Sequence, residues 1–230
     1  MINQTAPINL IDAQSLFYQY GKDHLAQLVL KGATLHVNAG EFVILAGPSG
    51  SGKSTLLSLI GALRHCQTGT LRIAGHDVTT TNEDVLREVR KKIGYVFQQH
   101  NLLEFLTAIQ NVEMTLEMFP EYSKAMREEL SAQILEKVGL GKHLDYYPSQ
   151  LSVGQKQRVA IARSLVHNPS LILADEPTAS LDKQTGIQVT EILHEMVKNL
   201  GCGALVVTHD NRIFGYADKI LHIEDGVVNT

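Results

Sequence analysis

The chain has 230 residues, a length that suits one fairly large domain or a core carrying an inserted subdomain. Its 44% hydrophobic content is enough for a substantial core, and a formal net charge of −4 argues against a nucleic-acid partner. Two cysteines without C-x-x-C spacing and no apolar run of bilayer length exclude a disulfide scaffold and an integral membrane protein. The start, Met1 to Leu10, lacks the basic and apolar regions of a signal peptide.

The first part of the chain is rich in predicted strands. These strands cover residues 8–18, 28–37, 42–45 and 70–74, with glycines between them. The third strand leads into a glycine-rich turn, and an apolar-periodic helix follows from Thr55 to Leu63. The turn and its continuation read Gly47, Pro48, Ser49, Gly50, Ser51, Gly52, Lys53, Ser54 and Thr55. A full G-x-x-x-x-G-K-S between a strand and a helix predicts a phosphate cradle rather than a merely flexible Gly/Ser loop.

Phosphate binding needs each residue type in this turn for a different chemical reason. The glycines let the backbone curl so that successive N–H groups point at phosphate oxygens, and the new helix adds its positive end. Lys53 can reach the outer phosphates, and the Ser54 hydroxyl can ligate magnesium. The sequence therefore predicts a nucleotide with Mg²⁺ as its cofactor.

The middle and the end of the chain alternate between helix and strand. Basic residues at 87–92 stand beside acidic residues at 83–88, which indicates the solvated face of a short helix. From about residue 107 to Gly139, apolar residues recur every four positions, as in helical structure. The later predicted elements are helix 154–166, strand 171–174, helix 183–200, strand 204–207 and a terminal hairpin at 219–228. This order indicates an α/β core with a helical insertion.

Two of the later strands end in polar residues. Asp175-Glu176 follows one strand, and Thr208-His209 follows another. Because the carboxyl ends of parallel strands form the ligand crevice, we expect these side chains to converge on the phosphates beside Lys53. We expect Asp175 to hold magnesium, Glu176 to polarise the attacking water and His209 to contact the γ-phosphate. The alternative is that the carboxylates cap a helix and the histidine is structural.

The segment Leu151-Ser152-Val153-Gly154-Gln155 resembles the L-S-G-G-Q signature of ATP-binding cassette (ABC) proteins. Other family motifs occur in the family's order, namely the aromatic-loop residue Tyr20 on adenine, the Q-loop Gln98, the D-loop Asp182 and the switch histidine His209. The resemblance implies an α/β P-loop NTPase of the ABC type, with a RecA-like mixed sheet, an antiparallel β subdomain and an inserted α-helical subdomain. It implies one ABC ATPase domain over residues 1–230, with 1–98 and 159–230 as catalytic core and 99–158 as the helical signature subdomain.

The resemblance also implies a mechanism. In this family two ATP-loaded subunits pack head to tail, so the signature residues Ser152, Gly154 and Gln155 would complete the ATP site of the opposite copy. Gln98 would sense magnesium and the lytic water, and Asp182 would communicate between the two sites. One departure is Val153, which stands where the family has its first signature glycine. If that position required a positive φ, a β-branched residue would be strained. Because Gly154, the phosphate-facing glycine by resemblance, is retained, we expect an active cassette with altered closure.

The finer resemblance is to the MacB, LolD and FtsE group, and within it to cyanobacterial DevA-type exporter ATPases. It rests on residues 98–108 with Asn111-Val112, and on segments near residues 90, 146–148 and 208–213. It implies an ATP-hydrolysing homodimer at the cytoplasmic face of the inner membrane. That dimer would drive a membrane permease, with a periplasmic adaptor and an outer-membrane channel, to export lipids, glycolipids, lipoproteins or hydrophobic compounds. A regulatory FtsE-like cassette that signals without cargo, and a soluble non-transport ABC ATPase, remain alternatives.

An apolar cluster follows Gln98. It consists of Leu102, Leu103, Phe105, Leu106 and Ile109. Either these residues fold into the core of the helical subdomain, or some of them line a groove for a short cytoplasmic helix of the permease.

Overall fold

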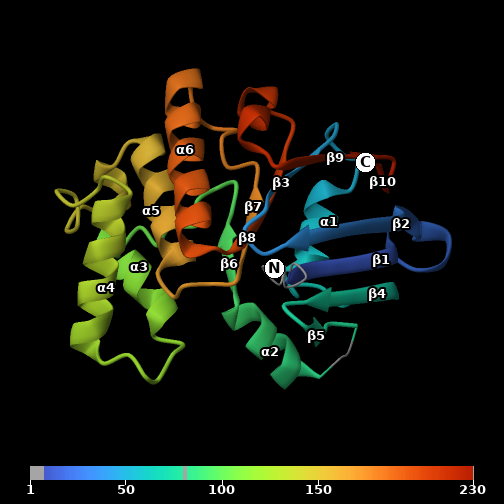
Figure 1. Cartoon of the computed structure of the whole chain (residues 1–230), viewed down its shortest axis with the longest axis horizontal. Helices are drawn as coiled ribbons and strands as arrows, with labels where there is room; N and C mark the ends of the chain where they lie inside the picture. Colours follow the sequence, from blue (N-terminus) through green and yellow to red (C-terminus); the bar gives the residue numbers. More distant parts are fainter. Residues whose placement is uncertain (1–7, 80–81, 230) are drawn as a thin grey trace, which may run out of the picture.

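The structure is a computed structural model, and it describes residues 8–79 and 82–229. The prediction that no signal peptide is present falls largely on residues 1–7, which lie outside the described part. In Figure 1 a central sheet separates a helical layer, on one side, from a second sheet on the other. This arrangement agrees with the predicted α/β class.

The central sheet has six strands in the order β10-β9-β3-β8-β7-β6. Five of these strands run parallel, and β10 returns antiparallel to β9 as the predicted terminal hairpin. The strands are β3 (Phe42–Ala46), β6 (Ile93–Val96), β7 (Leu171–Asp175), β8 (Gly203–Thr208), β9 (Lys219–Glu224) and β10 (Val227–Asn229). β6 was not predicted as a strand, because its four residues are too few to show a period.

The parallel strands are apolar throughout because both faces of the sheet are buried. Successive side chains of β3 alternate between two cores, with Val43 and Leu45 in one and Phe42 and Ile44 in the other. The first core lies between the two sheets and includes the helix α1 (Lys53–Ile60). The second core lies under the helical layer. Because both faces of the sheet are buried, packing fixes the positions of these strands and of the site residues at their ends.

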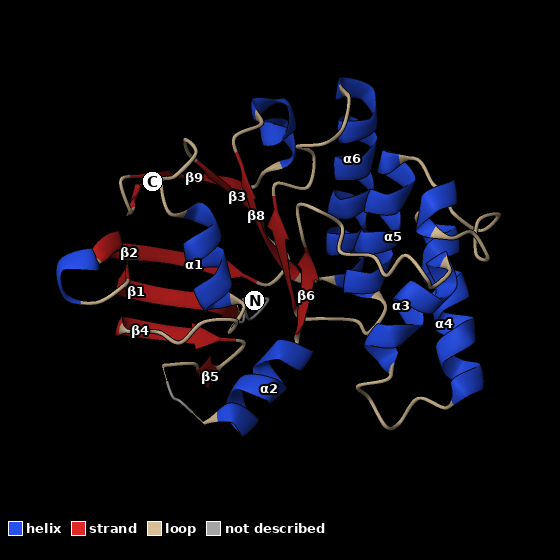
Figure 2. Ribbon diagram, turned by 180° about the vertical axis from the view of Figure 1, so that it is seen from behind, coloured by secondary structure: helices blue, strands red, loops and turns tan. Residues whose placement is uncertain are grey.

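The second sheet is antiparallel, with the order β2-β1-β4-β5, as predicted for the β subdomain. Its strands are β1 (Asn9–Tyr20), β2 (Gln27–Asn38), β4 (Thr68–Ile73) and β5 (His76–Asp77). Figure 2 shows α1 against this sheet, with α2 (Glu83–Lys91) below it. α2 buries Leu86 and Val89, whereas Glu83, Asp84, Arg87 and Glu88 are exposed and Arg90 and Lys91 are half-buried. This pattern agrees with the predicted solvated face of a short helix.

The helical layer consists of α3 (Ala108–Leu116), α4 (Lys124–Lys137), α5 (Val153–Leu165) and α6 (Lys183–Leu200). The helical stretch expected from 107 to 139 is two helices, each begun by its own cap, Thr107 and Ser123. Short 3₁₀ turns occupy Asp23–Leu25, Pro148–Gln150 and Asn211–Tyr216. The predicted subdomain boundary at residue 158 falls inside α5, and the helical residues share one core with the central sheet.

No helix within residues 8–79 and 82–229 is long and apolar enough to cross a bilayer. Both cysteines are free thiols, and Cys202 is buried in the second core. Burial raises the pKa of the Cys202 thiol to about 11. Cys202 is therefore a packing residue.

Candidate functional site

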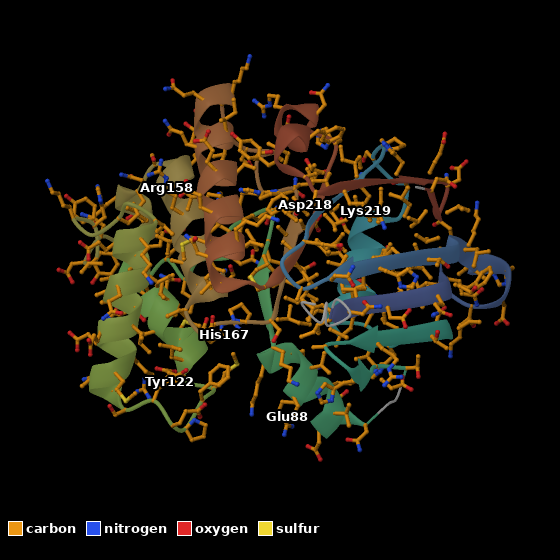
Figure 3. All side chains as sticks on the ribbon, viewed as in Figure 1. Glu88, Tyr122, Arg158, His167, Asp218 and Lys219 are labelled. Atoms are coloured by element: carbon orange, nitrogen blue, oxygen red, sulfur yellow. The ribbon has the colours of Figure 1, made fainter. Side chains whose placement is uncertain are left out.

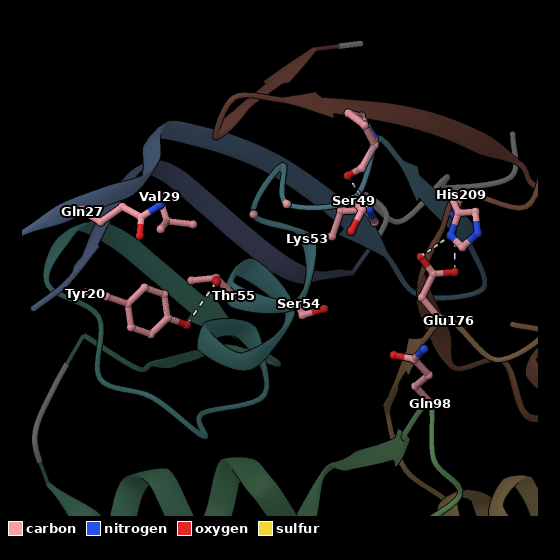
Figure 4. A pocket seen from close by; sticks show the side chains of 13 residues that line it. Tyr20, Gln27, Val29, Ser49, Lys53, Ser54, Thr55, Gln98, Glu176 and His209 are labelled. Carbon is pink, nitrogen blue, oxygen red and sulfur yellow. Dashed lines mark hydrogen bonds and ion pairs between the residues drawn. The ribbon is translucent and has the colours of Figure 1, made fainter.

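A cavity of ≈ 590 Å³ opens at the carboxyl end of β3, where the glycine-rich turn begins. Figure 4 shows side chains from several elements around it. The predicted site residues that line it are Tyr20, Pro48, Ser49, Gly50, Gly52, Lys53, Ser54, Thr55, Gln98, Glu176 and His209. Gln27 and Val29 of β2 also line it and were not predicted, because nothing in an exposed strand edge distinguishes them. The tertiary structure thus brings together motifs that are far apart in the sequence.

The glycine-rich turn ends at Gly52, which is the N-cap of α1 and has a φ of 104°. Among the described residues, no side chain caps α1, so its first N–H groups remain available to a ligand. Lys53 is 7% exposed, and its ammonium donates to the carbonyl oxygens of Gly47 and Pro48, each at 2.8 Å. The cation is thus held at the turn, where it can exchange a carbonyl for a phosphate oxygen.

Glycine is needed at position 47 for close packing, whereas the sequence predicted that it lets the backbone curl. A Cβ at this position would collide with the carbonyl oxygen of Ile223 in β9. Ser51 is also buried, and its amide donates to the Pro48 carbonyl at 3.3 Å. Neither residue lines the cavity, so both support the turn from behind.

The predicted magnesium ligands lie beside the turn. The Ser54 hydroxyl donates to Asp175 Oδ1 at 3.2 Å, which places a hydroxyl and a carboxylate oxygen next to each other. Burial raises the pKa of Asp175, against the lowering effect of the Ser54 hydrogen bond. Hard oxygen donors of this kind suit Mg²⁺, which usually binds one or two carboxylates together with substrate phosphates. The pair therefore fits the ion.

Glu176 follows Asp175 directly and has a φ of 46°, an uncommon conformation for a residue with a side chain. Its backbone N–H donates to the carbonyl of Val207 in β8 at 2.8 Å. Its carboxylate accepts from the Thr208 hydroxyl at 3.1 Å and contacts His209 Nδ1 at 2.8 Å. The carboxylate side chain is 11% exposed and the imidazole 66%. The two strand ends therefore converge as predicted, through a Glu176–His209 contact that the sequence did not indicate.

Tyr20 lies at the far end of the cavity, at the end of β1. Its hydroxyl contacts the Thr55 hydroxyl at 3.2 Å, and its ring packs edge-on against Tyr18 at 5.1 Å. The Arg64 guanidinium lies over the ring, 4.9 Å from its centre. Tyr20 thus takes part in local packing and also presents a ring to the cavity.

Gln98 follows β6 and lines the cavity. Just after it, His100 and Asn101 have positive φ angles of 59° and 50°. The Arg163 guanidinium of α5 donates to the carbonyl oxygens of both residues, at 2.6 Å each. Arg163 therefore ties α5 to the Gln98 loop, a link that sequence analysis missed because the two lie some 60 residues apart.

The signature residues lie apart from the first cavity. Ser152, Gly154 and Gln155 line a second hollow of ≈ 250 Å³, together with Arg158 and Gln188. In Figure 3 Arg158 is labelled on α5, in the helical layer and away from the second sheet. None of the described residues that line this hollow also lines the first. The signature is therefore not part of the cavity in its own chain.

Val153 is the first residue of α5 and is 46% exposed. It is absent from the described residues with positive φ. The backbone strain that a positive φ would have caused at Val153 therefore does not occur.

Thr185 lies against Gly154 and is hydrogen-bonded to Asp182. A Cβ on Gly154 would collide with Thr185 Cγ2. Thr185 in turn donates its backbone N–H to Asp182 Oδ1 at 3.1 Å, because Asp182 is the N-cap of α6. A hydrogen bond from the Thr185 side chain, together with this backbone bond, lowers the pKa of Asp182. Thr185 was missed because its importance depends on the close approach of α5 and α6.

Comparison with known proteins agrees with this geometry. The family described as ABC transporter matches residues 30–179. An uncharacterized ABC transporter ATP-binding protein of Methanocaldococcus jannaschii, MJ1508, is 41% identical over 95% of this chain and 97% of its own. The macrolide export ATP-binding/permease protein MacB of Escherichia coli K12 is 42% identical over 87% of this chain. The chain spans 31% of the length of that MacB protein.

Solved structures extend the comparison. A dimeric post-hydrolysis state of the ATP-binding cassette MJ0796, bound to ADP and Pi, has a TM-score of 0.88 and 37% identity. It covers 96% of this chain and 97% of its own. The cbiO1 protein of Clostridium perfringens, part of an ABC transporter complex, has a TM-score of 0.87 and 27% identity, with coverage of 97% and 88%. The family match covers more than half of the chain and the relatives cover nearly all of it, so the chain belongs to the ABC transporter family as one of its ATP-hydrolysing cassettes.

Proposed function

We propose that this cassette is the ATPase subunit of an export system, and that it dimerises head to tail around two ATP molecules to drive a separate membrane permease. The observation that carries the proposal is the convergence of the glycine-rich turn, Gln98, Glu176 and His209 on one cavity of ≈ 590 Å³. We propose the subdomain division given by the resemblance, with residues 1–98 and 159–230 as catalytic core and 99–158 as the signature subdomain.

ATP is the substrate of the proposed site. Lys53 already lies at the turn on two carbonyl oxygens, and the uncapped N-terminus of α1 offers further donors to the phosphates. We propose that the Tyr20 ring stacks on adenine with the face that Arg64 leaves open. Ser54 and Asp175, with Gln98, would hold Mg²⁺, which supplies charge neutralisation at the phosphates when bound.

We propose that Glu176 is the general base. The carboxylate oxygens of Glu176 accept hydrogen bonds from Thr208 and contact His209, so they point into the cavity with a fixed orientation. A carboxylate held in this way can accept a proton from a water that attacks the γ-phosphate. His209 is the more exposed partner and can turn from Glu176 towards the phosphate.

The separate position of the signature supports a dimer. Ser152, Gly154 and Gln155 line a hollow other than the cavity of their own chain, so in a head-to-tail dimer they would meet the nucleotide of the other copy. The similar MJ0796 cassette is dimeric when bound to ADP and Pi, which supports a dimer here. Asp182, exposed at the start of α6, would lie between the two sites.

The permease proposal rests on the relatives. MacB is named as an ATP-binding/permease protein, and this chain spans 31% of its length. That name supports the proposal that this cassette works with a permease. We propose that the cassette lies at the cytoplasmic face of the inner membrane, bound to that permease. We further propose export of a lipid, glycolipid, lipoprotein or hydrophobic compound, with a periplasmic adaptor and an outer-membrane channel.

Some residues of the apolar cluster after Gln98 pack against the core, and Phe105 is exposed and available to a permease helix. Leu102 and Ile109 pack against the second core, whereas Phe105 is 74% exposed. A hollow of ≈ 270 Å³ lies nearby, lined by Tyr95, Phe97, Asn101, Met118, Arg163 and His167 among others. None of the five predicted apolar residues lines this hollow, and a contact between some of them and a permease helix stays a prediction.

Figure 3 shows His167 between the helical layer and α2, and His167 is one of the residues that line this hollow. Burial lowers the pKa of His167 to about 4, so the imidazole is neutral at physiological pH. The Tyr95 and Phe97 rings are stacked with centres 4.2 Å apart, which gives the hollow an aromatic wall. We propose that a short cytoplasmic helix of the permease occupies this hollow and also contacts the exposed side chain of Phe105.

Copurification tests this function. The cassette, tagged and expressed in its own host, should bring down an untagged permease from detergent-solubilised membranes. Phe105→Glu should keep ATPase activity and lose the permease, while Ile8→Glu, at a site 70% exposed, should retain it. Failure of the wild-type cassette to bring down any membrane protein would contradict the transport role.

A further inference from the structure

The signature turn is held by a reciprocal pair of hydrogen bonds at the N-terminus of α5. The Gln155 backbone N–H donates to Ser152 Oγ at 3.2 Å, and the Ser152 backbone N–H donates to Gln155 Oε1 at 2.8 Å. This capping box fixes the orientation of the Gln155 amide, because only its oxygen can accept from a backbone N–H. The Gln155 Nε2 group must therefore point away from Ser152.

The Nε2 group of Gln155 meets the imidazole of His143, with Nε2 atoms 3.2 Å apart. An amide nitrogen is only a donor, so His143 Nε2 must be the acceptor and cannot carry a proton. The proton of the neutral ring then lies on Nδ1, which is buried and has no hydrogen-bond partner among the described residues. The contact thus requires one particular tautomer of His143.

His143 itself is fixed by the loop between α4 and α5. Its backbone N–H donates to the Leu140 carbonyl at 2.8 Å, and its carbonyl accepts from the Tyr146 N–H at 3.1 Å. Its ring packs edge-on against the Tyr146 ring, with centres 4.9 Å apart. The backbone and the ring of His143 are therefore held by contacts within their own loop, independently of Gln155.

We propose that His143 is a positioning residue for the signature, acting on Ser152 through Gln155. This inference rests on the proposed action of the signature on the nucleotide of a partner copy. His143 anchors one hydrogen of the Gln155 amide, and Gln155 in turn fixes the backbone N–H and the hydroxyl of Ser152. Without the anchor the side-chain amide can rotate and release the Ser152 backbone N–H, so the N-cap residue that carries the hydroxyl is held only by the bond from the Gln155 backbone.

The tautomer can be measured in the wild-type protein. A long-range ¹H–¹⁵N spectrum of protein labelled at histidine should show His143 protonated on Nδ1 and unprotonated on Nε2. A proton on Nε2 at neutral pH would overturn the proposal, because two donors would then face each other. This measurement does not depend on whether any variant folds.

Substitution tests the effect on catalysis. His143→Leu should lower turnover at saturating ATP by about 3- to 10-fold, the range expected for one lost hydrogen bond. ATP affinity of the isolated chain should stay unchanged. His143→Gln, whose side-chain oxygen can accept from Gln155, should restore most of the turnover. His222→Leu, at an exposed position on β9, is the matched control.

The outcomes separate the two proposals. A wild-type chain without ATP hydrolysis would contradict the proposed function itself. Hydrolysis that is lowered by Ser152→Ala but unchanged in His143→Leu would overturn only the role of His143. Equal losses in the leucine and glutamine variants would also overturn it, because a role in packing alone would not distinguish them.

Discussion

Two helix N-termini in this cassette are built in opposite ways. The N-terminus of α1 follows Gly52 and has no side-chain cap among the described residues, whereas that of α5 carries a full capping box between Ser152 and Gln155. An uncapped terminus leaves amide donors for a phosphate, and a capped one has already satisfied some of them. The first is ready for a ligand in its own chain, while the second can offer the Ser152 hydroxyl proton without losing its own structure.

The largest expected effect is on ATP hydrolysis, and it separates the chemical step from ATP binding at the α1 terminus. Glu176→Gln keeps the shape of the side chain but cannot accept a proton from water, so ATP hydrolysis should fall by about 100- to 10,000-fold. ATP binding at the α1 terminus should remain. The ATP-loaded dimer, in which the two termini would face one nucleotide, should then accumulate in size-exclusion chromatography.

Phosphate-release assays and light scattering measure both effects. Glu176→Asp, which retains a carboxylate, is the control. Hydrolysis at the wild-type rate in Glu176→Gln would exclude Glu176 as the base.

The second prediction separates the two termini by affinity. Lys53→Ala removes a charge from the phosphates and should weaken ATP binding to the isolated chain by about 10- to 100-fold. Ser152→Ala, at the capped terminus, should leave that affinity unchanged and lower only hydrolysis. Titration with a fluorescent ATP analogue measures the affinity. If Ser152→Ala weakened binding to the monomer as much as Lys53→Ala, the assignment of the signature to a partner site would be wrong.

The third prediction tests whether Gly154 is needed for packing or for phosphate. Gly154→Ala places a methyl group against Thr185 Cγ2, and such overpacking costs about 1–3 kcal/mol of stability. Thr185→Ser removes that methyl group, so the double variant should regain the lost stability. Thermal unfolding of the wild type, both single variants and the double variant measures the coupling. Stability restored without hydrolysis would show that Gly154 also has a role at the partner's nucleotide, and additive losses would refute the steric explanation.

The smallest expected effect concerns a carboxylate that follows the cavity residue His209 in the sequence. The Arg212 guanidinium and the Thr178 hydroxyl lower the pKa of Asp210, next to His209, from 3.8 to about 2. Because the folded-state pKa is the lower one, this carboxylate stabilises the fold above about pH 4, and that contribution is lost as the pH falls towards 2. Asp210→Asn should therefore flatten the acid dependence of the unfolding midpoint in that range. An unchanged acid profile would mean that other carboxylates dominate it.

The phosphate loop, the strand ends and the ABC family were all predictable because they depend on local order. A G-x-x-x-x-G-K-S that follows an apolar strand predicts a phosphate-binding loop. Parallel strands bring their carboxyl ends to one edge of the sheet. Hence Lys53, Glu176 and His209 were placed together from sequence, and the structure puts all three around one cavity.

Only the tertiary structure decided the contacts between segments distant in the chain. Arg163 reaches the Gln98 loop, Thr185 excludes a side chain at Gly154, and His143 contacts Gln155, and no periodicity or motif encodes these pairings. The reason is physical. Local patterns record which face of a helix or strand is buried, but which atoms meet depends on how α5 packs against its neighbours, and that packing is set by the whole core at once.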